Sequence, residues 1–450
     1  MEHLSLPEAD SDCEDGVKRS GPALVEKLKR LKGDESTRML DIFEQFPIAA
    51  HALHDLRPSR APSACSIELT DCAPIAVKMH RESPRHDEEP QKQLKMMLEA
   101  VVIARSTSPW AFPIAIASKQ DGAIRLCINF KPLNLRMKKD GWPLPSMDEI
   151  LEALAGEKRC TTLDLFAGYW QTRLAEELKK FATFRCKFGA RKLEAMPFGL
   201  KNAPPAFQRI MTALLEDLPY ARVYIDDIVI FSDAFEKHAK HVSEVLFKLD
   251  PHGYKIKLKK CSLVQQEACT LGHAASEEGV KIDGSKIEKV ANWKRPTSPK
   301  EARSFAPLAS CCRKFISGFV CLAEPLHQAG SRSAKEFAWD DECERSFALL
   351  KKAAAARPAL KGPDLTKPFI VYADARKCGV RAILAQADDD GAEHPIAFGS
   401  RGMSEHERKR SVAHKEGLAA AFAVKKHRRY LLRLPFKLIA NHQPLKWMLA

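Results

Sequence analysis

Hydrophobic and polar positions along the chain follow both helical and strand periods, which predicts a protein with mixed helices and sheets. Leu94, Met97, Leu98 and Val101 fall at the i, i+3, i+4 and i+7 positions of one helix face. Patterns of this kind predict helices over 22–46, 90–104, 202–215, 235–249, most of 286–355, and 411–432.

Short apolar runs bounded by turn residues predict strands. The runs at 112–117 and 124–130 flank Gln120-Asp121-Gly122, which is typical of a β-hairpin. Further strands are predicted at 161–165, in the two runs of 223–231, and at 369–373, 382–386 and 436–440. Proline and glycine crowd the stretch 357–368, which predicts a linker between two domains.

Composition narrows the class of protein. The chain of 450 residues is 45% hydrophobic with a formal net charge of +14, which favours a polyanionic partner such as nucleic acid, although ordinary solubility accounts for it equally well. The thirteen cysteines form no Cys-x-x-Cys pair, so we expect reduced, intracellular cysteines rather than a zinc module or a disulfide framework. The sequence shows neither a signal peptide nor a bilayer-length apolar run, so we expect an intracellular protein with no membrane partner.

The pair Asp226-Asp227 lies between two apolar runs that are predicted to be buried strands, so the two aspartates are expected to form the turn between them. Adjacent carboxylates repel each other unless a cation lies between them. A solvated acidic turn is the ordinary explanation of such a pair, but Asp164 ends another predicted strand. Carboxylates at strand ends can hold two Mg²⁺ ions, which activate a primer 3′-hydroxyl and stabilise the leaving pyrophosphate.

Several motifs around these carboxylates resemble those of reverse transcriptases from gypsy-type LTR retrotransposons. Residues 163–169 resemble the family's first catalytic motif, 196–204 its second motif, and 224–227 its metal-binding hairpin. Residues 108–110 and 125–127 resemble parts of the fingers, and 271–273 the primer-grip turn. The resemblance runs in family order from about residue 65 to residue 450, which makes it specific.

The resemblance implies roles for particular residues. Asp164, Asp226 and Asp227 would be catalytic and bind Mg²⁺, helped by the Leu165 carbonyl. Residues implied to bind the incoming nucleotide are Lys119, Arg125, Tyr169, Phe198 and Gly199. Tyr169 would be the aromatic gate against a ribose 2′-hydroxyl, although a core tyrosine fits its pattern as well. The basic run 255–260 fits either contacts to template–primer phosphates or a simple exposed strand.

The C-terminal part resembles an RNase H domain with changes at its site. Asp374 and Glu416 match two catalytic metal ligands of that domain, whereas Asn441 stands where the family has a third carboxylate. Arg381 stands where the family has a small glycine, and the chain stops before the family's last acidic motif. Because an amide carries no charge, Mg²⁺ should bind weakly or not at all here. We therefore expect little RNase H endonuclease activity.

The resemblance implies an α/β fold with right-hand fingers, palm and thumb followed by an incomplete RNase H-like domain. The expected division is 1–64 without an assigned role, 65–272 fingers and palm, 273–356 thumb and connection, 357–368 linker, and 369–450 a truncated RNase H-like domain. The implied function is RNA-directed DNA polymerase, acting on an RNA template, a DNA primer, dNTPs and the RNA–DNA hybrid. The alternative is a decayed or co-opted nucleic-acid-binding remnant, favoured by Asn129, Asn441 and the truncation.

Overall fold

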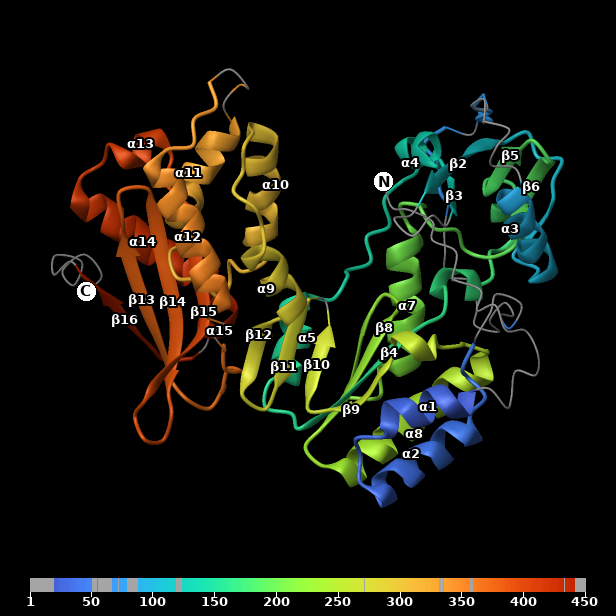
Figure 1. Cartoon of the computed structure of the whole chain (residues 1–450), viewed down its shortest axis with the longest axis horizontal. Coiled ribbons are helices and arrows are strands. Elements are labelled where there is room, and N and C mark those ends of the chain that lie inside the picture. Colours follow the sequence, from blue (N-terminus) through green and yellow to red (C-terminus); the bar gives the residue numbers. More distant parts are fainter. Residues whose placement is uncertain are drawn as a thin grey trace. The chain divides into compact units, whose positions relative to one another are not determined.

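The structure is a computed structural model, shown in Figure 1. It describes residues 20–50, 55, 67–71, 73–78, 88–118, 124–270, 272–331, 333, 336–356, 359–432 and 434–441. The chain divides into two units, and each is described by itself. Unit 1 comprises residues 1–147 and 158–266, and unit 2 comprises 148–157 and 267–450. Of the helices that the structure describes, none combines the length and the apolar character needed to span a membrane.

Unit 1 contains two sheets and the helices that cover them. Its first half consists of α1 (Ser20–Leu28), α2 (Gly33–Gln45), α3 (Glu88–Glu99), β1 (Ile103–Arg105), β2 (Phe112–Ser118), β3 (Ile124–Ile128) and α4 (Lys131–Arg136). The next elements are β4 (Arg159–Asp164), the 3-10 helix η3 (Gly168–Gln171), α6 (Glu176–Lys179), β5 (Thr183–Cys186), β6 (Gly189–Leu193) and α7 (Ala203–Leu215). The unit ends with β7 (Ala221–Tyr224), β8 (Asp227–Ser232), α8 (Phe235–Leu249), η4 (Asp250–His252), η5 (Leu258–Lys260) and β9 (Ser262–Gln265).

The four-stranded sheet of unit 1 carries the acidic residues. Its strand order is β7-β8-β4-β9, and the β7–β8 and β4–β8 pairs are antiparallel. β8 is buried along almost its whole length, because residues 228–232 are apolar or small and α8 packs against it. A second sheet, β1-β6-β5-β2-β3, contains the predicted hairpin, in which Ile114 pairs with Ile128. That prediction is confirmed.

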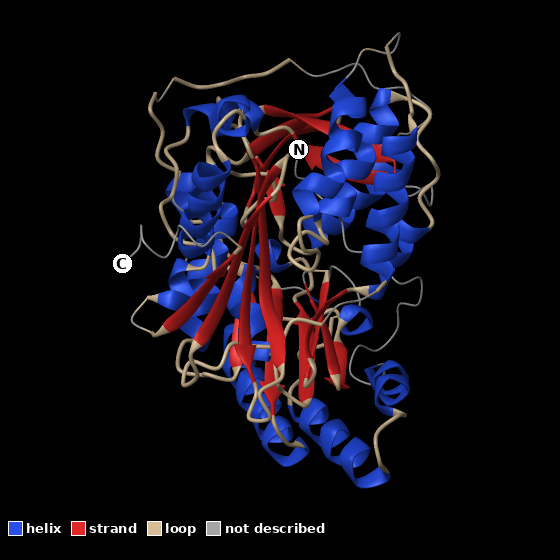
Figure 2. Cartoon of the chain, turned by 90° about the vertical axis from the view of Figure 1, so that its left-hand side faces the viewer, coloured by secondary structure: helices blue, strands red, loops and turns tan. Residues whose placement is uncertain are grey.

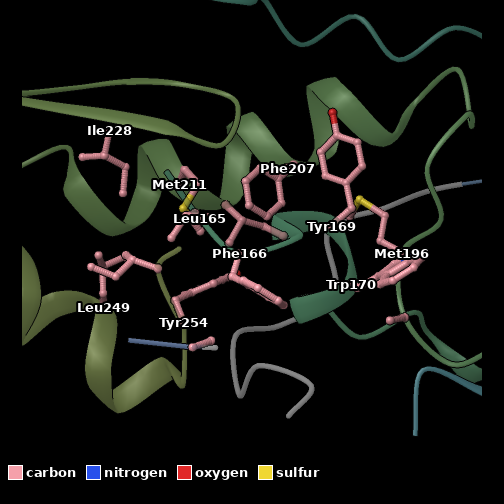
Figure 3. Close-up of a cluster of buried hydrophobic side chains, with 14 of the residues drawn as sticks. Leu165, Phe166, Tyr169, Trp170, Met196, Phe207, Met211, Ile228, Leu249 and Tyr254 are labelled. Atoms are coloured by element: carbon pink, nitrogen blue, oxygen red, sulfur yellow. The ribbon is translucent and has the colours of Figure 1, made fainter. Parts of the chain in front are cut away.

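One large hydrophobic cluster joins the sheets and helices of unit 1. Phe166 and Trp170 follow β4 and are fully buried, and Phe207 and Met211 reach the same cluster from α7. Figure 3 shows these side chains together with Tyr254. The segment that follows β4 is therefore held by packing on several sides, which fixes the position of the strand end.

Unit 2 combines helices with two sheets, in which most strand pairs are antiparallel. Its first elements are α5 (Met147–Leu154), β10 (Glu267–Thr270), β11 (His273–Ser276), β12 (Gly279–Ile282), α9 (Gly284–Ala291), α10 (Pro299–Ser310), α11 (Phe319–Ser331) and α12 (Asp341–Ala355). The rest are β13 (Phe369–Ala375), β14 (Gly379–Ala387), β15 (Glu393–Gly402), α13 (Glu405–Arg408), α14 (Val412–Lys426), α15 (Arg428–Leu431) and β16 (Phe436–Ala440).

The long sheet of unit 2 has the order β15-β14-β13-β16 and is seen among the red strands of Figure 2. β13 pairs antiparallel with β14 and parallel with β16. α14 packs against β13 and β14 through small buried residues such as Ala419 and Ala423, which allow a close approach of helix and sheet. Strands predicted at 369–373, 382–386 and 436–440 are confirmed, whereas β15 was not predicted.

Several predicted elements have different boundaries in the structure. The helix predicted over 22–46 is two helices, because Gly33 and an acidic first turn begin a new one. The helix predicted to 104 ends at Glu99, and Val101 is exposed with a φ of 57°, which ends a helix. The long helix predicted over 411–432 is interrupted at His427. Most unpredicted strands have only three or four residues, too few to show a period.

Two further expectations change. Cys321 and Cys378 form a disulfide with a Cα–Cα distance of 5.6 Å, so the expectation that all cysteines are reduced is wrong for this pair. Their separation of 57 residues gives no sign of pairing in the sequence. Within the predicted linker, Leu360 pairs with Val280 through two backbone hydrogen bonds of 2.8 and 2.9 Å, so the linker residue is held by β12.

Candidate active site

Two of the three predicted aspartates lie directly opposite each other on neighbouring strands. Asp164 ends β4 and pairs with Asp227, the first residue of β8. Side chains at directly opposed positions have Cβ atoms about 4.5–5.5 Å apart, and like charges there are destabilising. The Lys257 backbone N–H donates to the Asp164 carbonyl at 2.8 Å, which fixes the end of β4. The fold thus forces two carboxylates together at one edge of a buried sheet.

Asp226 lies in the tight turn that joins β7 to β8. Tyr224 pairs with Asp227, so the central turn residues are Ile225 and Asp226. The expectation that the two aspartates form the turn is therefore corrected: Asp227 already belongs to the strand. Ile225 has a φ of 57°, which is unusual for a β-branched residue and places Asp226 beside Leu165, whose N–H donates to the Asp226 carbonyl at 3.1 Å.

The environment of Asp226 and Asp227 disfavours their charged forms. Burial raises the pKa of Asp226, and the nearby Asp164 raises it further. Burial, followed by Asp226 and Asp164, raises the pKa of Asp227 to about 6. Shifts of this kind show that the three carboxylates share one electrostatic environment. The arrangement is costly without a cation and is therefore typical of a functional site.

Lys260 supplies the positive charge closest to these carboxylates in the described structure. Its Nζ lies 3.0 Å from Asp164 Oδ2, and the Lys260 side chain remains 60% exposed. Burial lowers the pKa of Lys260, but Asp164, Asp226 and Asp227 raise it more, with a net increase. Sequence reasoning placed Lys260 in a basic run that fitted either phosphate contacts or an exposed strand, and its contact with Asp164 was not foreseen.

The basic run 255–260 is not the exposed strand that was one of its two interpretations. Residues 258–260 form the 3-10 helix η5, and Lys257 Nζ lies 5.8 Å from the centroid of the Phe166 ring. Lys255 donates to the Pro47 carbonyl. The lysine alternation therefore reflects a folded loop beside the acidic site, and the phosphate-contact interpretation stays a prediction.

The residues predicted to form the nucleotide pocket are only partly described. Tyr169 is 8% exposed, and its ring centroid lies 4.8 Å from that of Phe198 and 5.3 Å from that of Phe207. Figure 3 shows its hydroxyl pointing away from the Phe207 ring. Gly199 has a φ of 82°, a conformation that favours glycine. Lys119 and the Arg125 side chain lie outside the described residues.

Two residues that sequence reasoning missed hold the hairpin turn in place. Gln208 is buried on α7; its Oε1 accepts from the Ile225 N–H at 2.7 Å and its Nε2 donates to the Val223 carbonyl at 3.1 Å. Gly168 lies so close to the turn that an added Cβ would meet the Asp226 Cβ at 3.3 Å and the Phe207 Cζ at 3.0 Å. Gln208 could have been found in the sequence, because it is a polar residue on the apolar face of a predicted helix, and a buried polar side chain needs hydrogen-bond partners.

The three aspartates fit a site that needs bound cations. In the described part of the chain, no group of three or more His, Cys, Asp or Glu side chains already has the arrangement of a preformed metal site. The hard carboxylate oxygens are nevertheless the ligands that Mg²⁺ prefers. Burial, Asp226 and Asp164 raise the pKa of Asp227, whereas Lys260 lowers it. Residues 164, 226 and 227 are therefore the ones that could hold Mg²⁺.

The second predicted acidic site is assembled in unit 2. Asp374 lies on β13, and the buried Glu416 on α14 accepts from the Ala375 N–H at 3.4 Å through Oε1. Asn441 follows β16, and its Nδ2 lies 3.5 Å from Asp374 Oδ1. The structure thus brings all three predicted positions together. It also places Arg381 at the same carboxylate, with Nε 2.6 Å from Asp374 Oδ2.

Two segments of the chain match known protein families. Residues 117–275 match a family described as reverse transcriptase (RNA-dependent DNA polymerase). Residues 339–438 match an RNase H-like domain found in reverse transcriptase. The chain therefore contains a reverse transcriptase domain that holds the three aspartates, followed by an RNase H-like domain that holds Asp374 and Glu416.

Curated relatives narrow the identification. The chain is 34% identical over 389 residues to the retrovirus-related Pol polyprotein from transposon 297 of Drosophila melanogaster, covering 85% of this chain and 36% of the relative. It is 30% identical over 357 residues to the transposon Tf2-3 polyprotein of Schizosaccharomyces pombe, covering 78% of this chain and 27% of that protein. The chain is thus similar to transposon Pol polyproteins, as its motifs predicted, and it spans 36% and 27% of the length of these two relatives.

Solved structures show the same fold. A foamy viral protease-reverse transcriptase in complex with dsDNA has a TM-score of 0.86 at 21% identity, over 99% of this chain and 92% of that one. A foamy viral protease-reverse transcriptase in complex with an RNA/DNA hybrid has a TM-score of 0.84 at 21% identity, over 95% of this chain and 58% of that one. The predicted fold class, a polymerase followed by an RNase H-like domain, is confirmed.

Proposed function

We propose that this chain is an RNA-directed DNA polymerase that adds dNTPs to the 3′-hydroxyl of a DNA primer on an RNA template. The observation that carries the proposal is the direct opposition of Asp164 and Asp227 across β4 and β8, with Asp226 in the adjoining turn. These residues lie inside the segment that matches the reverse transcriptase family. The net charge of +14 suits a nucleic-acid partner.

The chain's own residues would perform the positioning that phosphoryl transfer requires. Asp164, Asp226 and Asp227 would hold Mg²⁺, which when bound activates the primer hydroxyl and stabilises the leaving pyrophosphate. Gln208 keeps the turn that carries Asp226 fixed through its contacts with the Ile225 N–H and the Val223 carbonyl. Because the surrounding sheet is rigidly packed, the carboxylates need little reorganisation when substrate arrives.

The nucleotide would lie beside the aromatic cluster. Tyr169 follows β4 by five residues, and its ring packs between Phe198 and Phe207. A tyrosine held in this way is both a core residue and a rigid wall, so the two interpretations of Tyr169 do not exclude each other. We propose that this wall excludes a ribose 2′-hydroxyl, with Lys119 and Arg125 on the triphosphate.

Primer extension on poly(rA)–oligo(dT) with Mg²⁺ tests the proposal. The wild-type chain is expected to extend the primer, and the Asp226→Asn chain to lose extension while still binding the duplex. The matched control is Asp233→Asn, an exposed aspartate that ion-pairs with Lys237 just beyond β8. Absence of extension by folded wild-type protein, or unchanged extension by Asp226→Asn, would reject the proposal.

A further inference from the structure

The acidic site of unit 2 contains an arginine that contacts one of its two carboxylates. Asp374 on β13 and Arg381 on β14 are directly paired in the sheet register, so their side chains project from the same face. Arg381 Nε lies 2.6 Å from Asp374 Oδ2, while the Asp374 side chain is only 17% exposed. The pairing is therefore fixed by the register of two central strands and does not depend on a mobile surface chain.

The other oxygen of Asp374 is also engaged. Asn441 Nδ2 lies 3.5 Å from Asp374 Oδ1, and Arg376 Nε lies 3.5 Å from Oδ2. Glu416 accepts a hydrogen bond from the Ala375 N–H at 3.4 Å through Oε1. With two arginines beside two acids, the formal charge of the group is about zero, since an amide adds none. This set of donors does not fit a pair of Mg²⁺ ions, which need several anionic oxygens free of other cations.

From this disagreement we infer that Arg381 occupies the place of the metal ion, so that the RNase H-like domain of this chain is a metal-free, ion-paired site. The guanidinium is permanently charged and forms a directed contact with the carboxylate, so it does not leave as a hydrated cation would. Two differences act together: Arg381 forms an ion pair with Asp374, and the neutral Asn441 stands in place of a carboxylate. Reversing only one of them therefore leaves the other obstacle to metal binding in place.

A site without a metal ion would change the order of the reactions on an RNA–DNA hybrid. If the chain makes DNA on an RNA template, the RNA strand of the hybrid stays intact at this site. A separate hydrolytic activity that cleaves RNA within RNA–DNA hybrids must then act on the product before a second DNA strand is made. This consequence rests on the proposed polymerase function, whereas the metal-free site itself does not.

Counting bound Mn²⁺ by electron paramagnetic resonance tests the inference without any assay of activity. The full chain carries Asp226→Asn and Asp227→Asn, so that the site of unit 1 does not contribute. In this background we expect no specific Mn²⁺ site in unit 2. Adding Arg381→Gly together with Asn441→Asp should create such a site. The apparent affinity of this chain for Mn²⁺ should be at least about tenfold higher than that of the background chain.

A matched control replaces a different arginine of the same sheet. Arg401 pairs with Glu407 and not with Asp374, so Arg401→Gly with Asn441→Asp should not create the site. Because glycine weakens a strand, Arg381→Ala is made in parallel, and thermal unfolding verifies that each chain folds.

Two results would overturn the inference. One is Mn²⁺ binding in the background chain that disappears on Asp374→Asn. The other is a folded chain with Arg381→Ala and Asn441→Asp that binds no Mn²⁺. Neither result depends on polymerisation, so failure here is distinct from failure of the proposed function.

Discussion

Replacing Asp227 by asparagine should stabilise the metal-free chain at neutral pH. Asp227 is held opposite Asp164 and next to Asp226, and burial together with these neighbours raises its pKa from 3.8 to about 6. The folded state therefore binds the Asp227 proton more tightly than the unfolded state does. Asparagine keeps the shape of the side chain and removes the charge that the site disfavours.

The size of the effect follows from the pKa shift. A rise from 3.8 to about 6 corresponds to about 3 kcal/mol at 1.36 kcal/mol per pKa unit. Because the side chain is partly exposed, solvent screening reduces this, and we expect about 1–2 kcal/mol. The sign follows from linkage: the protonated form favours folding, so the favourable term is complete below pH 3.8 and is lost as the pH rises through about 6.

Hydrogen exchange of peptides that span β7 and β8 measures the free energy of local opening in both chains without divalent ions. At pH 7.5 the Asp227→Asn chain should exceed the wild type by about 1–2 kcal/mol, and the difference should shrink as the pH falls from 6 towards 4. Added Mg²⁺ should stabilise the wild type more than the variant. Equal opening free energies at pH 7.5, or a difference that grows on acidification, would refute the reasoning.

Three further predictions concern other contacts. Gln208→Ala leaves the Ile225 N–H without its hydrogen-bond acceptor, so kcat should fall about tenfold or more with little change in KM. Gln208→Glu retains the acceptor and should recover part of the rate. Lys260→Met should destabilise unit 1 by about 0.5–1 kcal/mol at pH 7.5 without divalent ions, because Asp164 loses its ion-pair partner; saturating Mg²⁺ should remove the difference in the unfolding midpoint. Cys321→Ser should lower the stability of unit 2 by about 2–4 kcal/mol, and a reducing agent should then lower the midpoint of the wild type but not of the variant.

Much of the candidate active site could be predicted because its signals are local in sequence. Asp164 and Asp226-Asp227 lie at the ends of apolar runs, and the order of the motifs indicated that the three residues belong to one site. The register that sets Asp164 opposite Asp227 could not be predicted, since it depends on pairing between segments about sixty residues apart. The turn residues were misplaced by one position, because the β7–β8 register pairs Tyr224 with Asp227.

Contacts made across the fold were the least predictable. Lys260 lies 96 residues from Asp164 in sequence, and its own neighbourhood only indicated a basic run. Arg381 was noted as a departure from a glycine, but only the β13–β14 register shows that it meets Asp374. The disulfide joins a helix to a hairpin turn, and no spacing rule relates its two cysteines. Short strands such as β5 and β10 were missed because four residues do not show a period.

The most direct test of the central claim is single-nucleotide incorporation on a preformed RNA-template–DNA-primer complex, measured at saturating dNTP and Mg²⁺. We predict that the wild type incorporates one nucleotide per bound primer, and that Asp164→Asn and Asp227→Asn each reduce the rate by at least about a hundredfold while the complex still forms. Incorporation by either variant at the wild-type rate would contradict the assignment of these opposed carboxylates to catalysis.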